Sequence, residues 1–156
     1  MQLLPDGSLE MKAVYVMSAA RKIKIGVAKD PHKRQRAIQA SIPWKVTLEA
    51  VWDVPAYRAF KVEKWAHTYL ERYRRGGEWF RCDLHTVRLF ERQLFAIAFG
   101  HNAFQDPCES DSEADQFAHA VMSQHRWMTL DEQRHFRWLL ARENLKATDP
   151  HPLLNP

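Results

Sequence analysis

The chain has 156 residues, 46% of them apolar, and its 23 Lys and Arg against 19 Asp and Glu give a formal charge of +4. This length excludes a large multidomain protein, and the apolar fraction excludes wholesale disorder. Because the sequence has no membrane-length apolar run, no signal-peptide pattern and only two cysteines, we expect a cytoplasmic protein without a membrane partner.

The charge is divided unevenly along the chain. Residues 1–100 carry 18 basic and 10 acidic side chains, a charge of +8, whereas residues 101–156 carry 5 and 9, a charge of −4. A basic segment beside an acidic one favours a polyanion as the partner of the first segment only. A solvated basic surface explains the charge equally well, so charge alone does not choose between these interpretations.

The first elements are predicted from residue alternation and cap residues. After a leader over residues 1–11, residues 12–27 hold two β-type runs, AVYVM and IKIGV, joined by a tight hairpin connection at residues 18–21. Asp30 followed by proline is typical of an N-cap and a first helical residue, which predicts a helix that reaches about Ser41.

A third strand and a long helix follow. Residues 45–54 alternate apolar and polar side chains, as a half-buried strand does. A helical pattern then runs from about residue 56 to residue 75 and stops at Gly76 and Gly77. A strand-like segment at 78–82 comes next, followed by a helix from Asp83 or Thr86 to about Gly100 and a linker at 101–111. Two further helices are expected at about 112–125 and 130–145. They begin at the capping-box patterns Ser110-x-x-Glu113 and Thr129-x-x-Glu132.

This order of elements predicts an α+β fold. We expect a small, mainly antiparallel three-stranded sheet flanked by helices, followed by a C-terminal helical extension. The corresponding division of the chain is a leader at 1–11, a folded domain at 12–100, a linker at 101–111 and an acidic helical tail at 112–156.

Two registers are open for the hairpin. In the first, Tyr15 lies opposite Lys24; in the second, Ala19 pairs with Lys22 and Tyr15 lies opposite Gly26. Either register keeps Tyr15 and Lys24 on the face opposite the apolar residues, which we expect to be the outer face. A cross-strand tyrosine–lysine packing pair is the simpler interpretation of these two side chains.

The long helix carries two polar residues on its apolar stripe. Glu63 and His67 share helical spacing with Phe60 and Leu70. A buried carboxylate is costly without a partner or a metal. A hydrogen bond between Glu63 and His67 at the edge of the stripe is the plain interpretation, and ligation of a hard divalent cation is the alternative.

Several short segments follow one another at a recognisable spacing. Ala13-Val14-Tyr15 and Lys24-Ile25-Gly26 come first, and Arg34 follows the glycine by eight residues. Glu63 then lies on a helix after the third strand. In this order, over about residues 12–100, the sequence resembles the GIY-YIG nuclease superfamily, with alanine at the usual glycine of the first motif and lysine at the usual first tyrosine of the second.

The resemblance is greatest to the short phage and bacterial branch of that superfamily. This branch has KIG as its second motif, and the segments Glu63-x-x-x-His67 and Glu78-Trp79-Phe80 also look like it. Trp79 and Phe80 themselves are expected in the core. The implied function is that of a metal-dependent endonuclease, a hydrolase that cleaves DNA phosphodiester bonds, from a phage or mobile element or from a repair system.

The resemblance carries five catalytic residues over to this chain, namely Tyr15, Lys24, Arg34, Glu63 and His67. Glu63 would hold a divalent metal, Mg²⁺ or Mn²⁺. Arg34 would donate to the charged transition state, and His67 would orient Glu63 or transfer a proton. Tyr15 would position or deprotonate the attacking water, for which a nearby cation such as Lys24 would have to lower its pKa from about 10.

Further basic residues are candidates for contacts with the DNA backbone, whether single- or double-stranded. They are Lys22, Lys29, Lys33, Arg36, Arg74 and Arg75. In the tail, Cys108 and three histidines invite a zinc interpretation, but their spacings match no compact ligand motif.

Two other interpretations stay open. The first is a non-catalytic module that binds nucleic acid or protein on the same scaffold, because Lys24 replaces a tyrosine of the site. The second assigns the function to the acidic tail, as a helical hairpin that binds a protein partner or covers the basic face. The oligomeric state is open in both.

Overall fold

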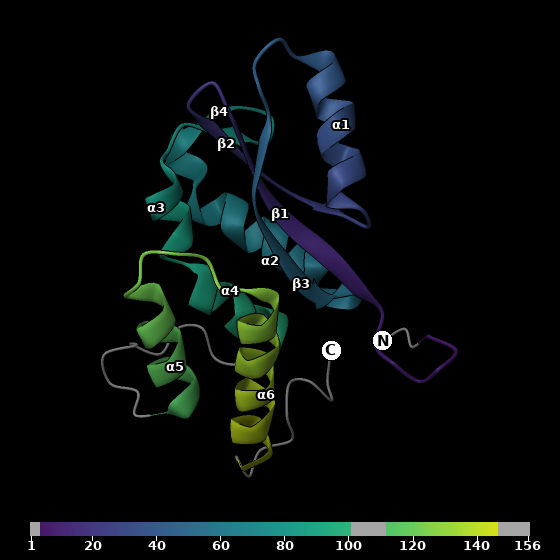
Figure 1. Ribbon diagram of the computed structural model, residues 1–156, viewed down its shortest axis with the longest axis vertical. Coiled ribbons are helices and arrows are strands. Elements are labelled where there is room, and N and C mark those ends of the chain that lie inside the picture. Colours follow the sequence, from purple (N-terminus) through teal and green to yellow (C-terminus); the bar gives the residue numbers. More distant parts are fainter. Residues whose placement is uncertain (1–3, 101–111, 147–156) are drawn as a thin grey trace.

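The computed structural model describes residues 4–100 and 112–146, which form a sheet with helices on both faces (Figure 1). The strands within this part lie in the order β3-β1-β2-β5-β4, and every neighbouring pair is antiparallel. The strands are β1 (Met11–Ala19), β2 (Lys22–Ala28), β3 (Thr47–Pro55), β4 (Arg74–Gly76) and β5 (Trp79–Phe80). The helices are α1 (Pro31–Ser41), α2 (Ala56–Tyr69), the 3₁₀ turn η1 (Glu71–Tyr73), α3 (Leu84–Arg88), α4 (Glu91–Ala98), α5 (Glu113–Met122) and α6 (Leu130–Lys146).

The predicted α+β class is confirmed, but the sheet has five strands instead of three. The difference arises where the long helix was expected to continue to residue 75. Helix α2 ends at Tyr69, and Arg74–Gly76 instead pairs with β5, which in turn pairs with β2. Pairing along the edge of a sheet satisfies backbone groups over several residues, and tertiary context of this kind overrides local helix preference.

The β1–β2 hairpin adopts the second of the two predicted registers. Ala19 pairs with Lys22 and Tyr15 with Gly26, so the register that placed Tyr15 opposite Lys24 is wrong. The turn consists of Ala20 and Arg21, with φ of 50° and 64°. Positive φ at both central residues is the requirement of a two-residue type I′ turn, whose twist matches that of the strands it joins.

The two faces of the sheet carry separate apolar clusters. Val14, Val16 and Trp52 face the main core, against α2 and α4. On the other face, α1 covers a smaller cluster that includes Tyr15. Tyr15 and Lys24 do share one face, but the expectation that this face is the outer one is wrong, because they are only 2% and 7% exposed. Tyr15 packs in the cluster under α1, and Lys24 contacts Glu78 and Trp79.

Side-chain caps mark the starts of several helices. Asp30 accepts a hydrogen bond from the Lys33 N–H at 3.1 Å ahead of Pro31, as predicted for α1. Asp83, and not Thr86, caps α3. The single helix expected there is divided into α3 and α4. None of the helices in the described part is long and apolar enough to span a membrane.

The two C-terminal helices begin at different kinds of cap. Thr129 and Glu132 form the predicted capping box, in which each side chain bonds the backbone N–H of the other, at 3.0 and 3.2 Å. At α5 the cap is Ser112, which accepts from Asp115 N at 3.1 Å. The predicted cap Ser110 lies outside the described residues.

Helices α5 and α6 pack into the same core as the sheet. Phe136 and Leu140 on α6 and Ala118 on α5 belong to the main apolar cluster. The Trp52 and Trp127 rings meet edge to face, with centroids 5.5 Å apart. Gln133 on α6 donates to the Val51 carbonyl of β3 at 3.0 Å. The helical extension is therefore joined to the sheet by apolar packing and by specific hydrogen bonds.

Candidate active site

Polar side chains from different elements converge around β2, the middle strand of the sheet, where the short strand β5 covers only two of its residues. They are Tyr15 on β1, Lys24 on β2, Arg34 on α1, Glu63 and His67 on α2, and Glu78 between β4 and β5. We call these six residues the Tyr15 cluster. All five residues predicted as catalytic are in it, and each interacts electrostatically with at least one other member.

The Tyr15 ring lies against the backbone of Gly26 and directs its hydroxyl toward Arg34. Burial is the largest effect on this hydroxyl and raises the pKa of Tyr15 above its ordinary value of 10.0, while the Arg34 guanidinium opposes the rise. The charges of Glu78 and Glu63 add to the rise. The lowering of the Tyr15 pKa that we expected from Lys24 does not occur, and Tyr15 is a neutral hydroxyl at pH 7.

Lys24 is paired with Glu78. Its buried Nζ donates to Glu78 Oε2 at 2.7 Å and lies 5.7 Å from the centroid of the Trp79 ring. Burial acts to raise the pKa of Glu78, but the hydrogen bond and charge of Lys24 outweigh it and leave the pKa below its ordinary value. Lys24 is thus neutralised by a carboxylate and is not a free cation of the site.

Glu78 is the member of the cluster for which the sequence predicts no role. In the sequence it is the first residue of the segment Glu78-Trp79-Phe80. Strand β5 pairs Trp79 with Lys24, and this register places Glu78 beside the lysine. The sequence predicts a strand-like segment at 78–82, but alternation does not say which strand it pairs with. The expectation of core positions holds for Phe80, which is fully buried, whereas Trp79 is partly exposed.

Glu63 and His67 occupy the part of the β2 edge that β5 does not cover. Strand β5 pairs with β2 only at Ile23 and Lys24, so on the side away from β1 no strand among the described residues pairs with β2 beyond Lys24. There His67 Nε2 lies 2.7 Å from the Ile25 carbonyl oxygen, and the Val27 N–H bonds the Glu63 carboxylate. A carbonyl only accepts, so Nε2 carries the proton and Nδ1 has the lone pair in the neutral ring.

The Glu63 carboxylate is half-buried and next to other charges. Burial is the main effect and raises its pKa above the ordinary value, and the nearby Glu78 carboxylate raises it further. His67, the Val27 N–H and Lys24 act in the opposite direction without cancelling the rise. Among the described residues no three His, Cys, Asp or Glu side chains cluster as a ready metal site. A cation here would therefore draw on carboxylate oxygen together with water or phosphate.

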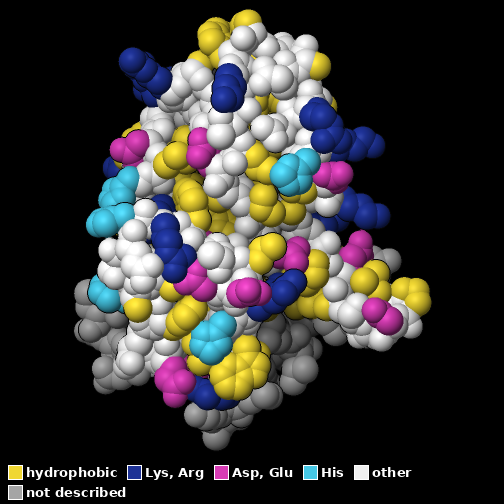
Figure 2. All heavy atoms as spheres, viewed as in Figure 1, with side chains coloured by type: hydrophobic (Ala, Val, Ile, Leu, Met, Phe, Trp, Pro, Cys, Tyr) yellow, Lys and Arg dark blue, Asp and Glu magenta, His cyan; other side chains and the backbone are white. Residues whose placement is uncertain are grey.

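Basic side chains flank the cluster, and Figure 2 shows Lys and Arg along the side of the molecule formed by α1. Of the six predicted contacts with nucleic acid, five are exposed, namely Lys22, Lys29, Lys33, Arg36 and Arg75. Arg74 differs, because its Nε pairs with Glu71 at 2.9 Å and its guanidinium lies 5.0 Å from the centroid of the Phe80 ring. Arg74 thus has a structural partner on each side.

The comparison with known families identifies one domain in this chain. Residues 12–94, more than half of the 156 residues, match the T5orf172 domain, a phage-associated domain related to nuclease-type folds. No curated protein and no solved structure matches the chain. The matched segment includes the whole Tyr15 cluster and ends within α4. The chain therefore belongs to the T5orf172 domain family.

Proposed function

We propose that this protein is a metal-dependent nuclease of the GIY-YIG type that hydrolyses DNA phosphodiester bonds at the Tyr15 cluster. Its family suggests a nuclease-like or DNA-binding function. The observation that carries the proposal is the convergence of Tyr15, Arg34 and Glu63 from β1, α1 and α2 around β2. A carboxylate, a guanidinium and a hydroxyl are the groups that metal-assisted phosphate hydrolysis requires. Of the three residues Arg34 is exposed, Glu63 is half-buried and Tyr15 is buried.

Glu63 would hold the metal. Both burial and the Glu78 carboxylate disfavour its ionised form, and a divalent cation would relieve both effects. Hard cations prefer carboxylate oxygen and often bind proteins through one or two carboxylates, with water and substrate phosphate completing the shell. The donor set fits Mg²⁺ or Mn²⁺, and such an ion when bound would polarise a phosphate oxygen and stabilise the leaving 3′ oxygen.

Arg34 would bind the phosphate that is cleaved. It is exposed on α1, next to the Tyr15 hydroxyl, and its planar guanidinium offers two parallel donors to non-bridging oxygens. The negative charge on these oxygens grows in the transition state, so fixed donors at this place lower the barrier. Lys24 would act indirectly, by holding Glu78 and packing on Trp79.

Proton transfer would be divided between Tyr15 and His67. The raised pKa of Tyr15 makes it a poor base at pH 7, and we assign its hydroxyl to holding the attacking water through hydrogen bonds. His67 has its Nε2 proton engaged by the Ile25 carbonyl. Its Nδ1 is therefore the basic nitrogen of the cluster and would accept the proton of the water.

The test is cleavage of single- and double-stranded DNA by the purified chain with Mg²⁺ or Mn²⁺. Glu63→Gln should abolish cleavage, a loss of about a hundredfold or more, while circular dichroism shows an unchanged fold. Asp131→Asn is the matched control, since its carboxylate is 94% exposed on α6 and should leave the rate unchanged. Absence of cleavage by the wild type, or full activity of Glu63→Gln, would contradict the proposal.

A non-catalytic nucleic-acid-binding module is the second candidate. The Lys24–Glu78 pair favours this candidate. Lys24 stands where the second motif of GIY-YIG nucleases usually has its first tyrosine, and its side chain is buried and neutralised by Glu78. Such a module would bind DNA with an affinity that falls steeply with salt, would not cleave it, and would be indifferent to Glu63→Gln. Measurements of DNA cleavage and DNA binding with the wild type and Glu63→Gln therefore distinguish a nuclease from a non-catalytic binding module.

A further inference from the structure

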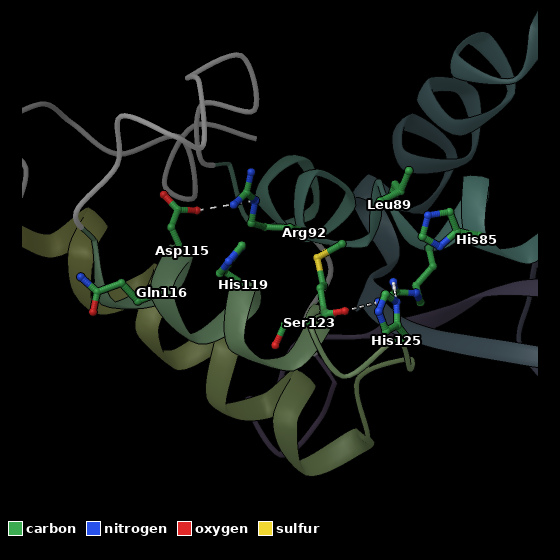
Figure 3. Close-up of a pocket in the computed structure, with 10 residues that line it drawn as sticks. His85, Leu89, Arg92, Asp115, Gln116, His119, Ser123 and His125 are labelled. Carbon is green, nitrogen blue, oxygen red and sulfur yellow. Dashed lines mark hydrogen bonds and ion pairs between the residues drawn. The ribbon is translucent and has the colours of Figure 1, made fainter.

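A second site lies away from the Tyr15 cluster, between α3 and α4 on one side and α5 on the other. It is a cavity of about 560 Å³, and Figure 3 shows its lining side chains. Arg92, Asp115 and His119 line one end, and His85 and His125 line the other (Figure 3). Its α5 side lies beyond residue 94, where the family match ends, so the cavity is not a feature of the T5orf172 domain alone.

The charged groups of this cavity are mainly basic. Arg88 and Arg92 come from α3 and α4, and Asp115 is the single carboxylate of the described lining. Asp115 is held by the Ser112 hydroxyl at 3.0 Å and approaches Arg92 Nε only at 3.8 Å. This long contact leaves the terminal guanidinium nitrogens of Arg92 outside the pair. A second anion would therefore find donors that Asp115 does not use.

The other end of the cavity has fixed hydrogen-bond donors. Arg88 is buried, and it donates to the Met122 carbonyl at 2.7 Å and to His125 Nδ1 at 3.3 Å. Arginine can only donate, so Nδ1 of His125 accepts and its Nε2 carries the proton. The His85 ring lies beside it, with centroids 6.3 Å apart. His125 has φ of 55°, an uncommon value for a residue other than glycine, and its backbone N–H donates to the Met122 carbonyl at 3.0 Å.

We propose that this cavity binds a phosphate monoester of nucleotide size. The volume lies in the range of small-molecule sites, which combine apolar walls with a few placed polar groups. Leu89 and Met122 supply apolar surface, and Arg92 with the histidines supplies donors to phosphate oxygens. A DNA backbone would use the charged groups but not the apolar walls between them, which favours a small ligand over the substrate strand.

Titration calorimetry with AMP, inorganic phosphate and adenosine tests the proposal on the full chain. AMP and phosphate should bind the wild type, and adenosine, which lacks the phosphate, should not. Arg92→Gln should weaken AMP binding about tenfold, the effect of one charge-assisted hydrogen bond. Arg134→Gln, an equal change of charge on the outer side of α6, should leave binding unchanged. If Arg92→Gln does not fold, His119→Gln on α5 serves as the second variant.

The proposal is independent of the nuclease function, and one further variant keeps the two sites apart. Glu63→Gln alters the Tyr15 cluster and should bind AMP as the wild type does. Loss of AMP binding in this variant would assign the phosphate to the Tyr15 cluster and overturn the proposal. No binding by the wild type at millimolar AMP, equal binding of adenosine, or an Arg92→Gln variant with wild-type affinity would overturn it as well.

Discussion

The Tyr15 ring crosses β2 directly over Gly26. A Cβ atom at position 26 would lie 2.4 Å from the Tyr15 hydroxyl oxygen and 2.6 Å from Cζ, closer than non-bonded atoms can approach. The two residues are opposite each other in the β1–β2 ladder. The glycine is therefore required by the space that the tyrosine ring takes, and this space lets the hydroxyl reach Arg34 on α1.

Gly26→Ala should displace Tyr15. We expect a loss of about 1–3 kcal/mol in the free energy of unfolding, the usual cost of an overpacked core position, and a loss of any DNA cleavage. Urea denaturation measures the first effect. In a Tyr15→Ala background the same substitution should cost much less, because the ring that it strikes is gone. Equal costs in both backgrounds would contradict the steric explanation.

Arg34→Lys should lower the cleavage rate nearly as much as Arg34→Gln, by about a hundredfold to a thousandfold. Lysine keeps the charge but loses the two parallel donors that a phosphate accepts from a guanidinium. Single-turnover cleavage rates measure the effect. The neighbouring exposed Lys33 is the matched control. Lys33→Gln should weaken DNA binding evenly across sequences, reduce its salt dependence by about one charge, and leave the single-turnover rate at saturating protein unchanged.

The stability of the protein should fall as pH rises toward 7 because of Glu91. This residue is fully buried between the Trp52 indole and the Met128 N–H, and burial raises its pKa to about 7. Between about pH 4.5 and 7 the folded state keeps a proton that the unfolded state has released, so this contribution is full below that window and lost above it. The expected change is at most about 3 kcal/mol.

Denaturation at pH 5 and pH 8 checks this dependence. Glu91→Gln, which keeps an acceptor for Trp52, should reduce the difference between the two pH values. Asp131→Asn, with its exposed carboxylate, should retain the wild-type difference. A Glu91→Gln variant with an unaltered pH profile would show that another group causes it.

A chain that ends at residue 100 should fail to fold cooperatively. Helices α5 and α6 supply part of the main apolar cluster, and Gln133 bonds the backbone of β3. Their removal would expose Trp52 and leave the buried Glu91 without the Met128 N–H. Broad thermal unfolding and binding of a hydrophobic dye are the expected signs. A sharp transition near the wild-type Tm would show that residues 1–100 suffice.

The role of the acidic tail has to be tested without removing α5 and α6, because both helices pack in the main apolar cluster. Deletion of the tail would disturb the core, so it does not test whether the tail covers a basic surface or binds a partner. Neutralising exposed acids such as Asp131 and Glu113 leaves the apolar contacts intact. A rise in DNA affinity after these changes would support the covering role, and unchanged affinity would count against it.

The sequence alone predicted the local elements with good accuracy where caps and alternation are strong. Asp30 with Pro31 and the Thr129–Glu132 box define helix starts through bonds within four residues, which need no tertiary context. The alternation of β1 and β2 also placed Tyr15 and Lys24 on one face in either register. The strand-like segment predicted at 78–82 contains β5, but the short strand β4 was not predicted, because it forms only by pairing with β5.

The sequence by itself thus determined the first three strands and the helices between them, five of the six residues of the Tyr15 cluster, and the shared face of Tyr15 and Lys24. Tertiary structure decided which register the hairpin takes, that Tyr15 and Lys24 are buried, and that Lys24 is neutralised by Glu78. It also decided that α5 and α6 of the predicted acidic helical tail share the main core, so that within the described residues these helices pack against the sheet. These properties depend on contacts between residues far apart in the chain, which periodicity and caps do not encode.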